Sequence, residues 1–151
     1  MSFRPTILVL AAGQGSRFHG SSHKLQQPLG GGSVLGNTLR HAIESHLPVV
    51  VVTTTLLAPL VAGQLATRDM VVISDADAHR GMGYSIAAGV AERAGAQGWL
   101  VLPGDMPMVR PATLRAVAAG LAQHAVVFAQ YRGRRGHPVG FSAELYSELV
   151  M

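Results

Sequence analysis

Short apolar runs alternate with stretches of helical periodicity along most of the chain. The runs are rich in β-branched residues and are bounded by glycine or proline, which is typical of buried strands. We expect strands at Thr6–Ala12, Val49–Thr54, Met70–Ser74, Gly98–Leu102 and Ala125–Tyr131, with a short sixth at Val139–Phe141. Apolar residues between these runs recur at helical spacing, which indicates amphipathic helices. The expected helices are Val34–Ser45, Leu56–Ala66, Tyr84–Arg93, Thr113–Leu121 and a further one starting in Ala143–Val150.

The order of these elements predicts an α/β fold with three layers. Strand–helix–strand units connect in a right-handed sense and give a mainly parallel, Rossmann-like sheet. Continuous apolar strands agree, because helices cover both faces of a parallel sheet. We expect one domain across residues 1–151. Ligands of such sheets bind at the carboxyl ends of the strands, so the segments after Ala12, Thr54, Ser74 and Leu102 are the first candidates for a site.

Composition narrows the function classes. The 151 residues are 48% hydrophobic and 13% charged, which indicates a globular chain with a large core. No cysteine is present, so disulfides and thiolate metal sites are excluded, and the cytoplasm is the expected location. The apolar stretches are too short to span a bilayer. The net charge of +4 favours a small anionic ligand, since 5% aromatic residues are too few for a base-stacking nucleic-acid platform.

A glycine-rich segment, LAAGQGSRFHGSSHKLQQPLG, ends the first expected strand and opens the long loop that follows it. Gly13 and Gly15 allow a sharp turn that presents N–H groups to an anion, and Arg17 and Lys24 can bind phosphate oxygens. The alternative is a flexible turn with two solvated cations. The segment does not match a Walker loop, and Phe18 stands where the dinucleotide fingerprint needs its third glycine.

An aspartate, Asp105, stands at the carboxyl end of the fourth expected strand, in LVLPGDMPMV. An acid at this place can hold Mg²⁺ beside a triphosphate, since Mg²⁺ takes hard oxygen ligands and often uses only one or two carboxylates plus phosphate. The alternative is a turn aspartate before Pro107. Joined with the glycine-rich loop, the metal role is favoured.

Two further segments carry candidate ligand contacts. In RGMGYSIAAGV, Gly83 and Ser85 lie at the start of an expected helix, whose N–H groups can face a nucleotide or an acceptor phosphate. The alternative there is an ordinary capped helix. In YRGRRGHPVGF, a basic turn that includes Arg135 and His137 is either a solvated hairpin or a lid over an anionic acceptor.

In this order, the segments resemble the molybdopterin nucleotidyltransferases of the glycosyltransferase-A-like group. The nearest branch looks like the molybdenum cofactor cytidylyltransferases, on LAAGQGSRFHG with Lys24, GMGYSIAAGV, and LPGDMPMV followed by GRRGHPVGF. The guanylyl branch reads Leu-Ala-Gly-Gly at the first loop, where this chain has Leu10, Ala11, Ala12 and Gly13. The methyl group of Ala12 would crowd a purine more than glycine would, which favours cytosine.

The resemblance implies roles for the matching residues. With the contacts proposed above, the nucleotide-binding set is Leu10, Ala11, Ala12, Gly13, Gly15, Arg17, Lys24, Gly83 and Ser85. Arg17 and Lys24 would act in catalysis together with Asp105, the Mg²⁺ ligand, while Arg135 and His137 would bind the acceptor. Topology predicts that the triphosphate-binding and metal-binding residues line one cleft at the carboxyl edge of the sheet.

The implied reaction moves CMP from CTP to molybdopterin or the molybdenum cofactor, with release of pyrophosphate and with Mg²⁺ as cofactor. A molybdoenzyme that receives the product is a further expected partner, whereas nucleic acid and membranes are not. One alternative is a guanylyl or sugar-phosphate nucleotidyltransferase built on the same loop. A second alternative is a module that binds nucleotide or molybdenum cofactor without turnover.

Two features depart from the family pattern. His23 precedes Lys24 where family members carry an acid, which would alter how that lysine is held. Related enzymes continue for a few tens of residues beyond the position of Met151 and supply a further aspartate near the metal. We therefore expect the C-terminal portion of the family domain to be lacking here, which motivates the alternative of a binding module.

Overall fold

The computed structural model describes residues 4–13, 24–26, 28–30 and 32–151. A six-stranded sheet forms its centre, in the order β5-β4-β1-β6-β8-β7. The strands are β1 Thr6–Ala11, β4 Val49–Thr54, β5 Met70–Ile73, β6 Gly98–Pro103, β7 Val126–Tyr131 and β8 Arg134–Ser142. β1, β4, β5 and β6 run parallel, while β8 is antiparallel to both β6 and β7. The prediction of a mainly parallel sheet is confirmed.

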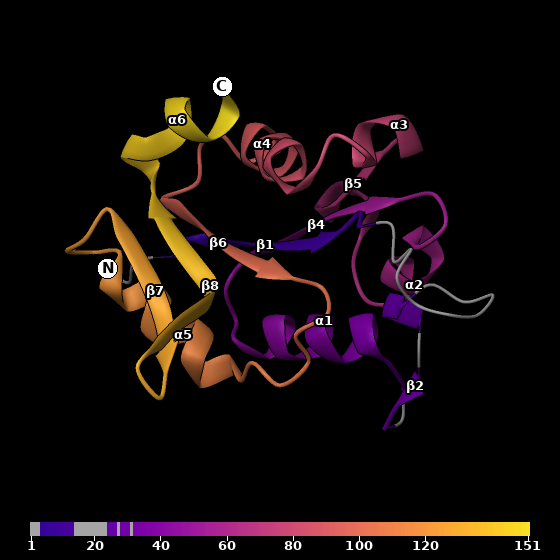
Figure 1. Ribbon diagram of the computed structural model, residues 1–151, viewed down its shortest axis with the longest axis horizontal. Helices are drawn as coiled ribbons and strands as arrows, with labels where there is room; N and C mark the ends of the chain where they lie inside the picture. Colours follow the sequence, from indigo (N-terminus) through magenta and orange to yellow (C-terminus); the bar gives the residue numbers. More distant parts are fainter. Residues whose placement is uncertain (1–3, 14–23, 27, 31) are drawn as a thin grey trace.

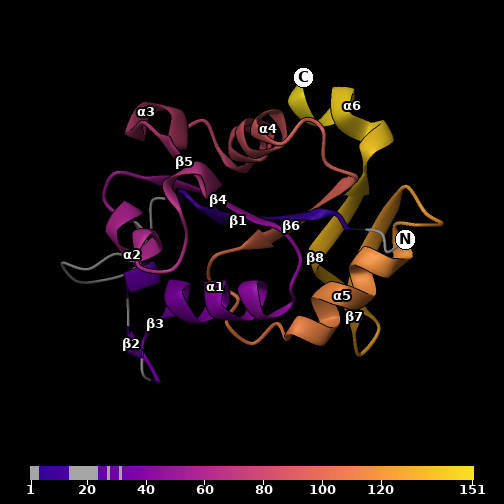
Figure 2. The ribbon, with the colours of Figure 1, turned by 180° about the vertical axis from the view of Figure 1, so that it is seen from behind.

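Helices cover both faces of the sheet and complete the three layers (Figure 1). One face carries α1 (Val34–Glu44), α2 (Ala58–Ala62) and α5 (Pro111–Gly120), as the reverse view also shows (Figure 2). The other face carries α3 (Asp75–Ala78), α4 (Met82–Glu92) and α6 (Tyr146–Val150). None of the helices within the described residues has the length and apolar composition needed to cross a bilayer.

The central strands are buried on both faces, which explains their uninterrupted apolar sequences. In β1, Ile7 and Val9 pack on the side of α1 and α5, while Leu8 and Leu10 pack on the side of α4. β4 and β6 alternate in the same way. Side chains along a strand point to opposite faces, so a strand enclosed by helices buries every side chain and is mostly apolar.

Local signals fix where the longer helices begin. The Oγ atom of Ser33 caps α1 by accepting a hydrogen bond from Gly36 N at 2.9 Å. α5 starts at Pro111, a residue that suits a first helical turn because its missing N–H needs no partner there. α4 starts after Gly81, whose φ of 99° is a conformation that favours glycine. α4 and α5 therefore begin two residues before their predicted starts at Tyr84 and Thr113.

The predicted helix over Leu56–Ala66 is wrong in extent, and one short helix was not predicted. α2 covers only Ala58–Ala62 and is followed by Gly63. Leu57, just before the helix, and Val61, within it, are buried in the core. Leu65 continues the apolar pattern beyond the helix, because it packs against the same core cluster from the turn before β5. α3 has the sequence DADA, which carries no apolar stripe, and it forms because the Ser74 hydroxyl caps it.

The segment from Gln14 to Ser33 was expected to be a long loop, and its second half contains short elements instead. They are a 3₁₀ helix η1 (Lys24–Gln26) and the strands β2 (Pro28–Leu29) and β3 (Gly32–Ser33). β2 and β3 pair antiparallel, and Gly30 supplies a φ of 60° between them. Elements of two or three residues are too short to show a hydrophobic period.

The sixth strand is longer than the predicted Val139–Phe141. β8 extends from Arg134 to Ser142 and forms a hairpin with β7, in which Arg132 and Gly133 both adopt positive φ. A turn of this kind matches the right-handed twist of the two strands. The first half of β8 is polar and exposed, so its strand conformation depends on backbone pairing with β7 rather than on an apolar pattern. Beyond β8, η3 (Ala143–Leu145) leads into α6, in agreement with the predicted helix start.

Candidate functional site

The carboxyl ends of the parallel strands share one edge of the sheet, and two of the candidate residues meet there. β1 pairs in parallel with β6, and Leu10 lies opposite Pro103. Gly13 follows the end of β1, and Asp105 follows the end of β6, so the two lie at adjacent points of this edge. This is the edge where open α/β sheets bind their ligands.

Gly104, which follows β6, is hydrogen-bonded to the end of β1. Its N–H donates to the carbonyl oxygen of Leu10 at 2.8 Å. A Cβ atom at this position would lie 3.0 Å from that oxygen and 3.0 Å from Cδ1 of Leu35, so a larger residue would force a shift. Asp105 comes next and is exposed. The close approach of Gly104 to β1 therefore fixes where the Asp105 backbone leaves the sheet.

The end of β1 is held from its other side as well. Thr53, on β4, donates its hydroxyl hydrogen to the carbonyl oxygen of Ala11 at 3.0 Å.

Ala12 is 2% exposed and packs in the core cluster on the α4 side. Its methyl group therefore lies in the core and not beside a bound base, so the argument that Ala12 crowds a purine is wrong.

The remaining triphosphate candidates lie in the segment between β1 and α1. Gly15 and Arg17 fall outside the described residues. Lys24 opens η1, and only its backbone is described. η1 packs against α1, with Leu25 buried in the core cluster beneath that helix. The backbone that carries Lys24 is thus attached to α1.

The N-terminus of α4 opens at the same edge, because this helix leads from the carboxyl ends of the strands back to the start of β6. Gly83 lies in its first turn, and a Cβ atom there would meet nothing within 4 Å, so packing does not require glycine. Ser85 is 5% exposed, and its N–H donates to Gly81 O at 3.3 Å. The guanidinium of Arg80 stacks over the Tyr84 ring at 4.4 Å, and Asp77 Oδ1, 3.8 Å from it, partly neutralises its charge. The exposed N-terminus of the helix is itself a feature that suits an anion.

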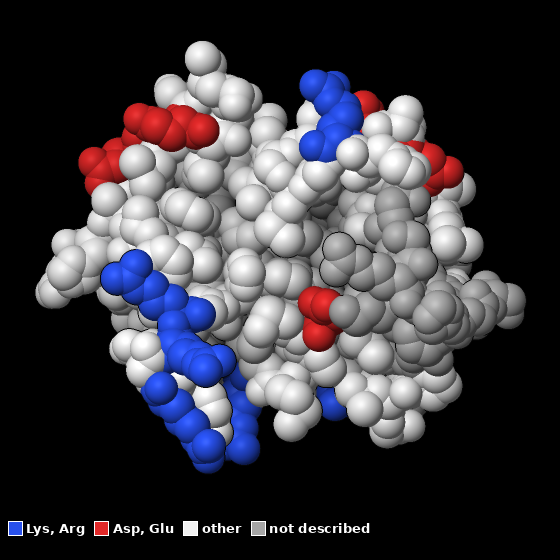
Figure 3. All heavy atoms as spheres, in the orientation of Figure 1, with Lys and Arg blue, Asp and Glu red and all other residues white. Residues whose placement is uncertain are grey.

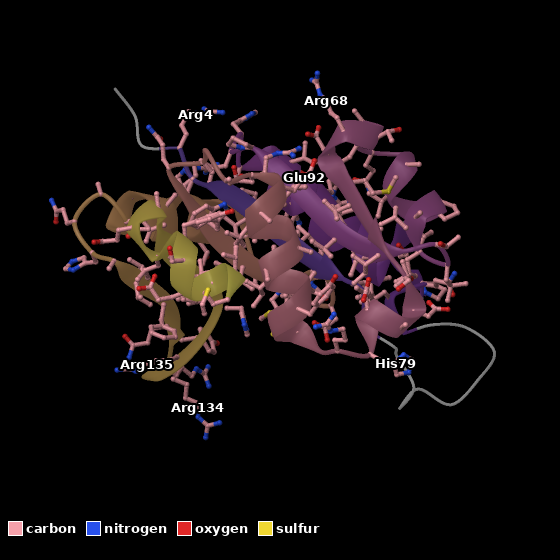
Figure 4. All side chains as sticks on the ribbon, turned by 90° about the horizontal axis from the view of Figure 1, so that it is seen from above. Arg4, Arg68, His79, Glu92, Arg134 and Arg135 are labelled. Atoms are coloured by element: carbon pink, nitrogen blue, oxygen red, sulfur yellow. The ribbon has the colours of Figure 1, made fainter. Side chains whose placement is uncertain are left out.

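The β7–β8 hairpin brings basic side chains to this side of the molecule. Figure 4 shows Arg134 and Arg135 on the side opposite Arg4 and Arg68, which mark the amino ends of the strands. Figure 3 shows basic side chains gathered over the hairpin, with an acidic side chain near the middle of the same face. The guanidinium of Arg135 stacks on the Phe128 ring at 5.2 Å. No carboxylate of the described residues pairs with Arg134 or Arg135, so their charge is available to an anion.

His137 lies at a break in the β7–β8 pairing. Phe128 pairs with Val139 and Ala129 pairs with Gly136, so His137 and the residue after it have no β7 partner. Pro138 explains the break, since proline has no N–H to donate to a neighbouring strand. On its other side β8 pairs with β6, and this pairing carries His137 toward the end of β6 that leads to Asp105.

The described residues suit a divalent metal that takes most of its ligands from a bound triphosphate. Within the described part of the chain, no three residues among His, Cys, Asp and Glu are grouped as a metal cage would require. A single exposed carboxylate at the carboxyl edge is compatible with Mg²⁺, which keeps waters and binds through one or two carboxylates plus substrate phosphates. Asp105 fits this pattern.

Sequence reasoning missed three polar residues that support this edge, namely Thr53 on β4 and Asn37 and Thr38 on α1. Each bonds to a backbone carbonyl far away in the sequence or in a neighbouring element. A buried threonine or asparagine gives no periodic signal, so the pattern of the chain offered no means of finding them.

The fold is that of a nucleotidyltransferase. The chain belongs to the MobA-like NTP transferase domain family, whose model matches residues 7–150. The bifunctional protein GlmU of Cereibacter sphaeroides is 32% identical over 147 residues, which is 93% of this chain and 32% of that protein. The chain spans about a quarter to a third of the length of the curated GlmU proteins that it matches.

Solved structures agree with this assignment. Rv0371c from Mycobacterium tuberculosis H37Rv superposes with a TM-score of 0.83 at 29% identity, over 99% of this chain and 77% of that chain. The same protein in complex with manganese gives a TM-score of 0.77 at 30% identity, over 96% of this chain and 74% of that chain. A nucleotidyl transferase from Methanothermobacter gives a TM-score of 0.75 at 26% identity, over 97% of this chain and 75% of that chain. None of these relatives is named as a molybdenum cofactor cytidylyltransferase.

Proposed function

We propose that this chain is a metal-dependent nucleotidyltransferase that moves CMP from CTP to molybdopterin or the molybdenum cofactor. The observation that supports metal-dependent nucleotidyl transfer is the hydrogen bond from Gly104 N to Leu10 O, which joins the strand end leading to Gly13 with the strand end leading to Asp105. CTP and the molybdopterin acceptor are proposed from the resemblance of the sequence motifs. A triphosphate with its metal needs N–H groups or cations on one side and a carboxylate on the other, and adjacent parallel strands supply both.

The reaction needs little covalent chemistry from the protein. An oxygen of the acceptor phosphate attacks the α-phosphorus of CTP, and the bond from that phosphorus to the bridging oxygen breaks as pyrophosphate leaves. Phosphate is already ionised at neutral pH, so no protein base is required. Positioning and charge neutralisation therefore supply the catalysis. When held at Asp105, Mg²⁺ or Mn²⁺ supplies charge neutralisation on the α-phosphate and the leaving group.

Each candidate residue has a place in this scheme. Gly13, Gly15, Arg17 and Lys24 bind the triphosphate, and the first turn of α4, with Gly83 and Ser85, binds the nucleotide from the opposite face of the sheet. Arg135 and His137 bind the acceptor, since the hairpin presents uncompensated positive charge on the side of the molecule where the strands end. The acceptor carries the complementary negative charge.

CTP should stabilise the protein more than GTP, UTP or ATP in the presence of Mg²⁺ or Mn²⁺. A nucleotide at about 100 times its dissociation constant adds roughly 2.7 kcal/mol to the free energy of unfolding, whereas one that does not bind adds nothing. Thermal-shift titration with the four nucleotides measures this directly. A clear preference for GTP would replace the cytidylyl assignment with the guanylyl one.

The second candidate function is a sugar-phosphate nucleotidyltransferase, because the same loop holds any nucleoside triphosphate, whatever the acceptor. UTP preference in the titration, followed by pyrophosphate release with a sugar phosphate and not with molybdopterin, would support it. Nucleotide binding without pyrophosphate release from any acceptor would support the binding module.

Removing the Arg135 side chain should raise the KM for the acceptor about tenfold and leave the CTP affinity unchanged, because a charge-assisted contact of this kind contributes on the order of 1.5 kcal/mol. Steady-state kinetics of Arg135→Ala with varied acceptor measures this. The matched control is Arg68→Ala, an exposed arginine on the opposite side of the molecule (Figure 4), which should leave KM unchanged. Equal KM values for the two variants would contradict the acceptor role.

A further inference from the structure

Two consecutive buried polar residues on α1 attach different segments of the candidate site to one helix. Asn37 is 7% exposed and Thr38 is 1% exposed. A buried polar side chain is costly unless it is hydrogen-bonded, so their partners indicate what they are for. Both side chains donate to backbone carbonyl groups, and one acceptor of each belongs to a candidate segment: Gly104 O to that of Asp105 and Leu29 O to that of Lys24.

Thr38 holds the Asp105 segment. Its Oγ1 lies 2.8 Å from the carbonyl oxygen of Gly104 and 3.0 Å from that of Val34. The hydroxyl has one hydrogen, and the shorter distance favours Gly104 as the acceptor. That carbonyl belongs to the peptide group that joins Gly104 to Asp105, while the N–H of Gly104 bonds to Leu10. Both peptide groups of Gly104 are therefore fixed, and the direction in which Asp105 leaves the strand is fixed with them.

Asn37 holds the Lys24 segment. Its Nδ2 group donates both hydrogens, to Leu29 O at 2.7 Å and to Ser33 O at 2.9 Å. Leu29 is in β2, a few residues after η1, and Ser33 is the cap of α1 itself. The side chain of Asn37 thus closes the β2–β3 hairpin against α1. Because Leu25 is buried beneath the same helix, the segment that begins with Lys24 is held at both of its ends.

We propose that Asn37 and Thr38 are positioning residues that set the separation between Asp105 and the Lys24 segment. The inference rests on the proposed function, in which Asp105 binds the metal and Lys24 binds the triphosphate. Because one turn of one helix holds both segments, the metal and the phosphates are presented at a fixed spacing before either ligand arrives. Thr38 acts on metal affinity through the Gly104–Asp105 peptide group, and Asn37 acts on phosphate affinity through the β2–β3 hairpin.

Thr38→Val should weaken Mn²⁺ binding about tenfold in the presence of CTP, the lower end of the effect of removing a group that orients a metal ligand. Valine keeps the shape of threonine and removes only the hydroxyl. Thr38→Ser keeps the hydroxyl and should bind Mn²⁺ as the wild type does. In metal-free protein, hydrogen exchange at the amides of Gly104 and Asp105 should be faster in Thr38→Val and unchanged in Thr38→Ser. Exchange measured by NMR gives a readout that needs no ligand.

Asn37→Ala should weaken binding of metal-free CTP about tenfold and leave the Mn²⁺ affinity of the CTP complex nearly unchanged. Asn37→Asp should have at least as large an effect, because its carboxylate would face two carbonyl oxygens that it cannot bond. Isothermal titration with CTP in EDTA, and then with Mn²⁺ at saturating CTP, separates the two quantities.

Two controls separate positioning from loss of stability. Trp99→Phe removes the 3.1 Å hydrogen bond from Trp99 Nε1 to Arg93 O, and Ser45→Ala removes a 2.6 Å hydrogen bond at the far end of α1. Both should lower the midpoint of thermal unfolding and leave CTP and Mn²⁺ binding unchanged. Binding losses in the controls as large as those in the Asn37 and Thr38 variants would overturn the inference, and so would wild-type binding in those variants. A wild-type chain that binds neither CTP nor Mn²⁺ would instead overturn the proposed function, and the inference with it.

Discussion

Replacing Asp105 by asparagine is expected to reduce CTP-dependent release of pyrophosphate by at least about a thousandfold. Asparagine keeps the shape of the side chain and removes its negative charge, so the variant loses the proposed metal ligand. Loss of one group that neutralises charge in the transition state costs about 10²–10³ in rate, and loss of the metal costs more. The measurement is pyrophosphate release with CTP, molybdopterin and Mg²⁺, joined with Mn²⁺ titration of both proteins.

Asp75→Asn is the matched control for this experiment. Asp75 is an exposed carboxylate that follows β5 at the same edge of the sheet, two strands away from β1. Its variant should keep wild-type turnover and Mn²⁺ affinity. Near-normal turnover of Asp105→Asn would show that Asp105 does not bind the metal, whatever the control does.

Trp99→Ala is expected to lower the free energy of unfolding by about 3–5 kcal/mol, the range for truncating a large buried aromatic residue. Trp99 is fully buried on β6, and its ring centroid lies 6.1 Å from that of Tyr146. Its Nε1–H donates to Arg93 O at 3.1 Å, which ties the end of α4 to the sheet. Since domains have only about 5–15 kcal/mol of stability, the loss is a large part of the total. Urea denaturation followed by circular dichroism measures it.

Two companion variants make this result interpretable. Trp99→Phe retains a ring and loses the N–H donor, so it should cost less than the alanine variant, about 1–2 kcal/mol. Met108→Ala alters a side chain that is 83% exposed and should change stability by less than about 0.5 kcal/mol. A cost for Trp99→Ala as small as that of Met108→Ala would mean that β6 and α6 do not share a packed core.

The sheet was predictable because its central strands leave a strong signal in the sequence. The strand Val49–Thr54 begins and ends where it was predicted, because its buried β-branched run gives a clear signal. The errors occur where tertiary contacts decide. The apolar pattern after Leu56 runs past the point where Gly63 ends α2, and β8 begins in the polar stretch at Arg134, where backbone pairing with β7 replaces burial. Hydrophobic periodicity reveals neither the end of α2 nor the start of β8.

The candidate site was predictable as far as topology determines it. Residues that follow two parallel strands must share an edge, and the strand order then makes Gly13 and Asp105 neighbours. The supporting bonds of Thr38 and Asn37 were not predictable, because each joins a helix to a carbonyl group that only the folded chain brings near. The roles of Gly15, Arg17 and Lys24 remain predictions.

The position of β1 between β4 and β6 also constrains the order in which the protein folds. β4 follows β1 after one helix, whereas β6 is made only after two further crossovers, and pairings between distant segments form slowly because a long loop must close first. A chain still emerging from the ribosome can pair β1 with β4 and bury α1, yet it has no partner for the other side of β1. The strand ends that lead to Gly13 and Asp105 therefore cannot meet until β6 has been made, so the proposed nucleotide site cannot form on a nascent chain that ends before this strand.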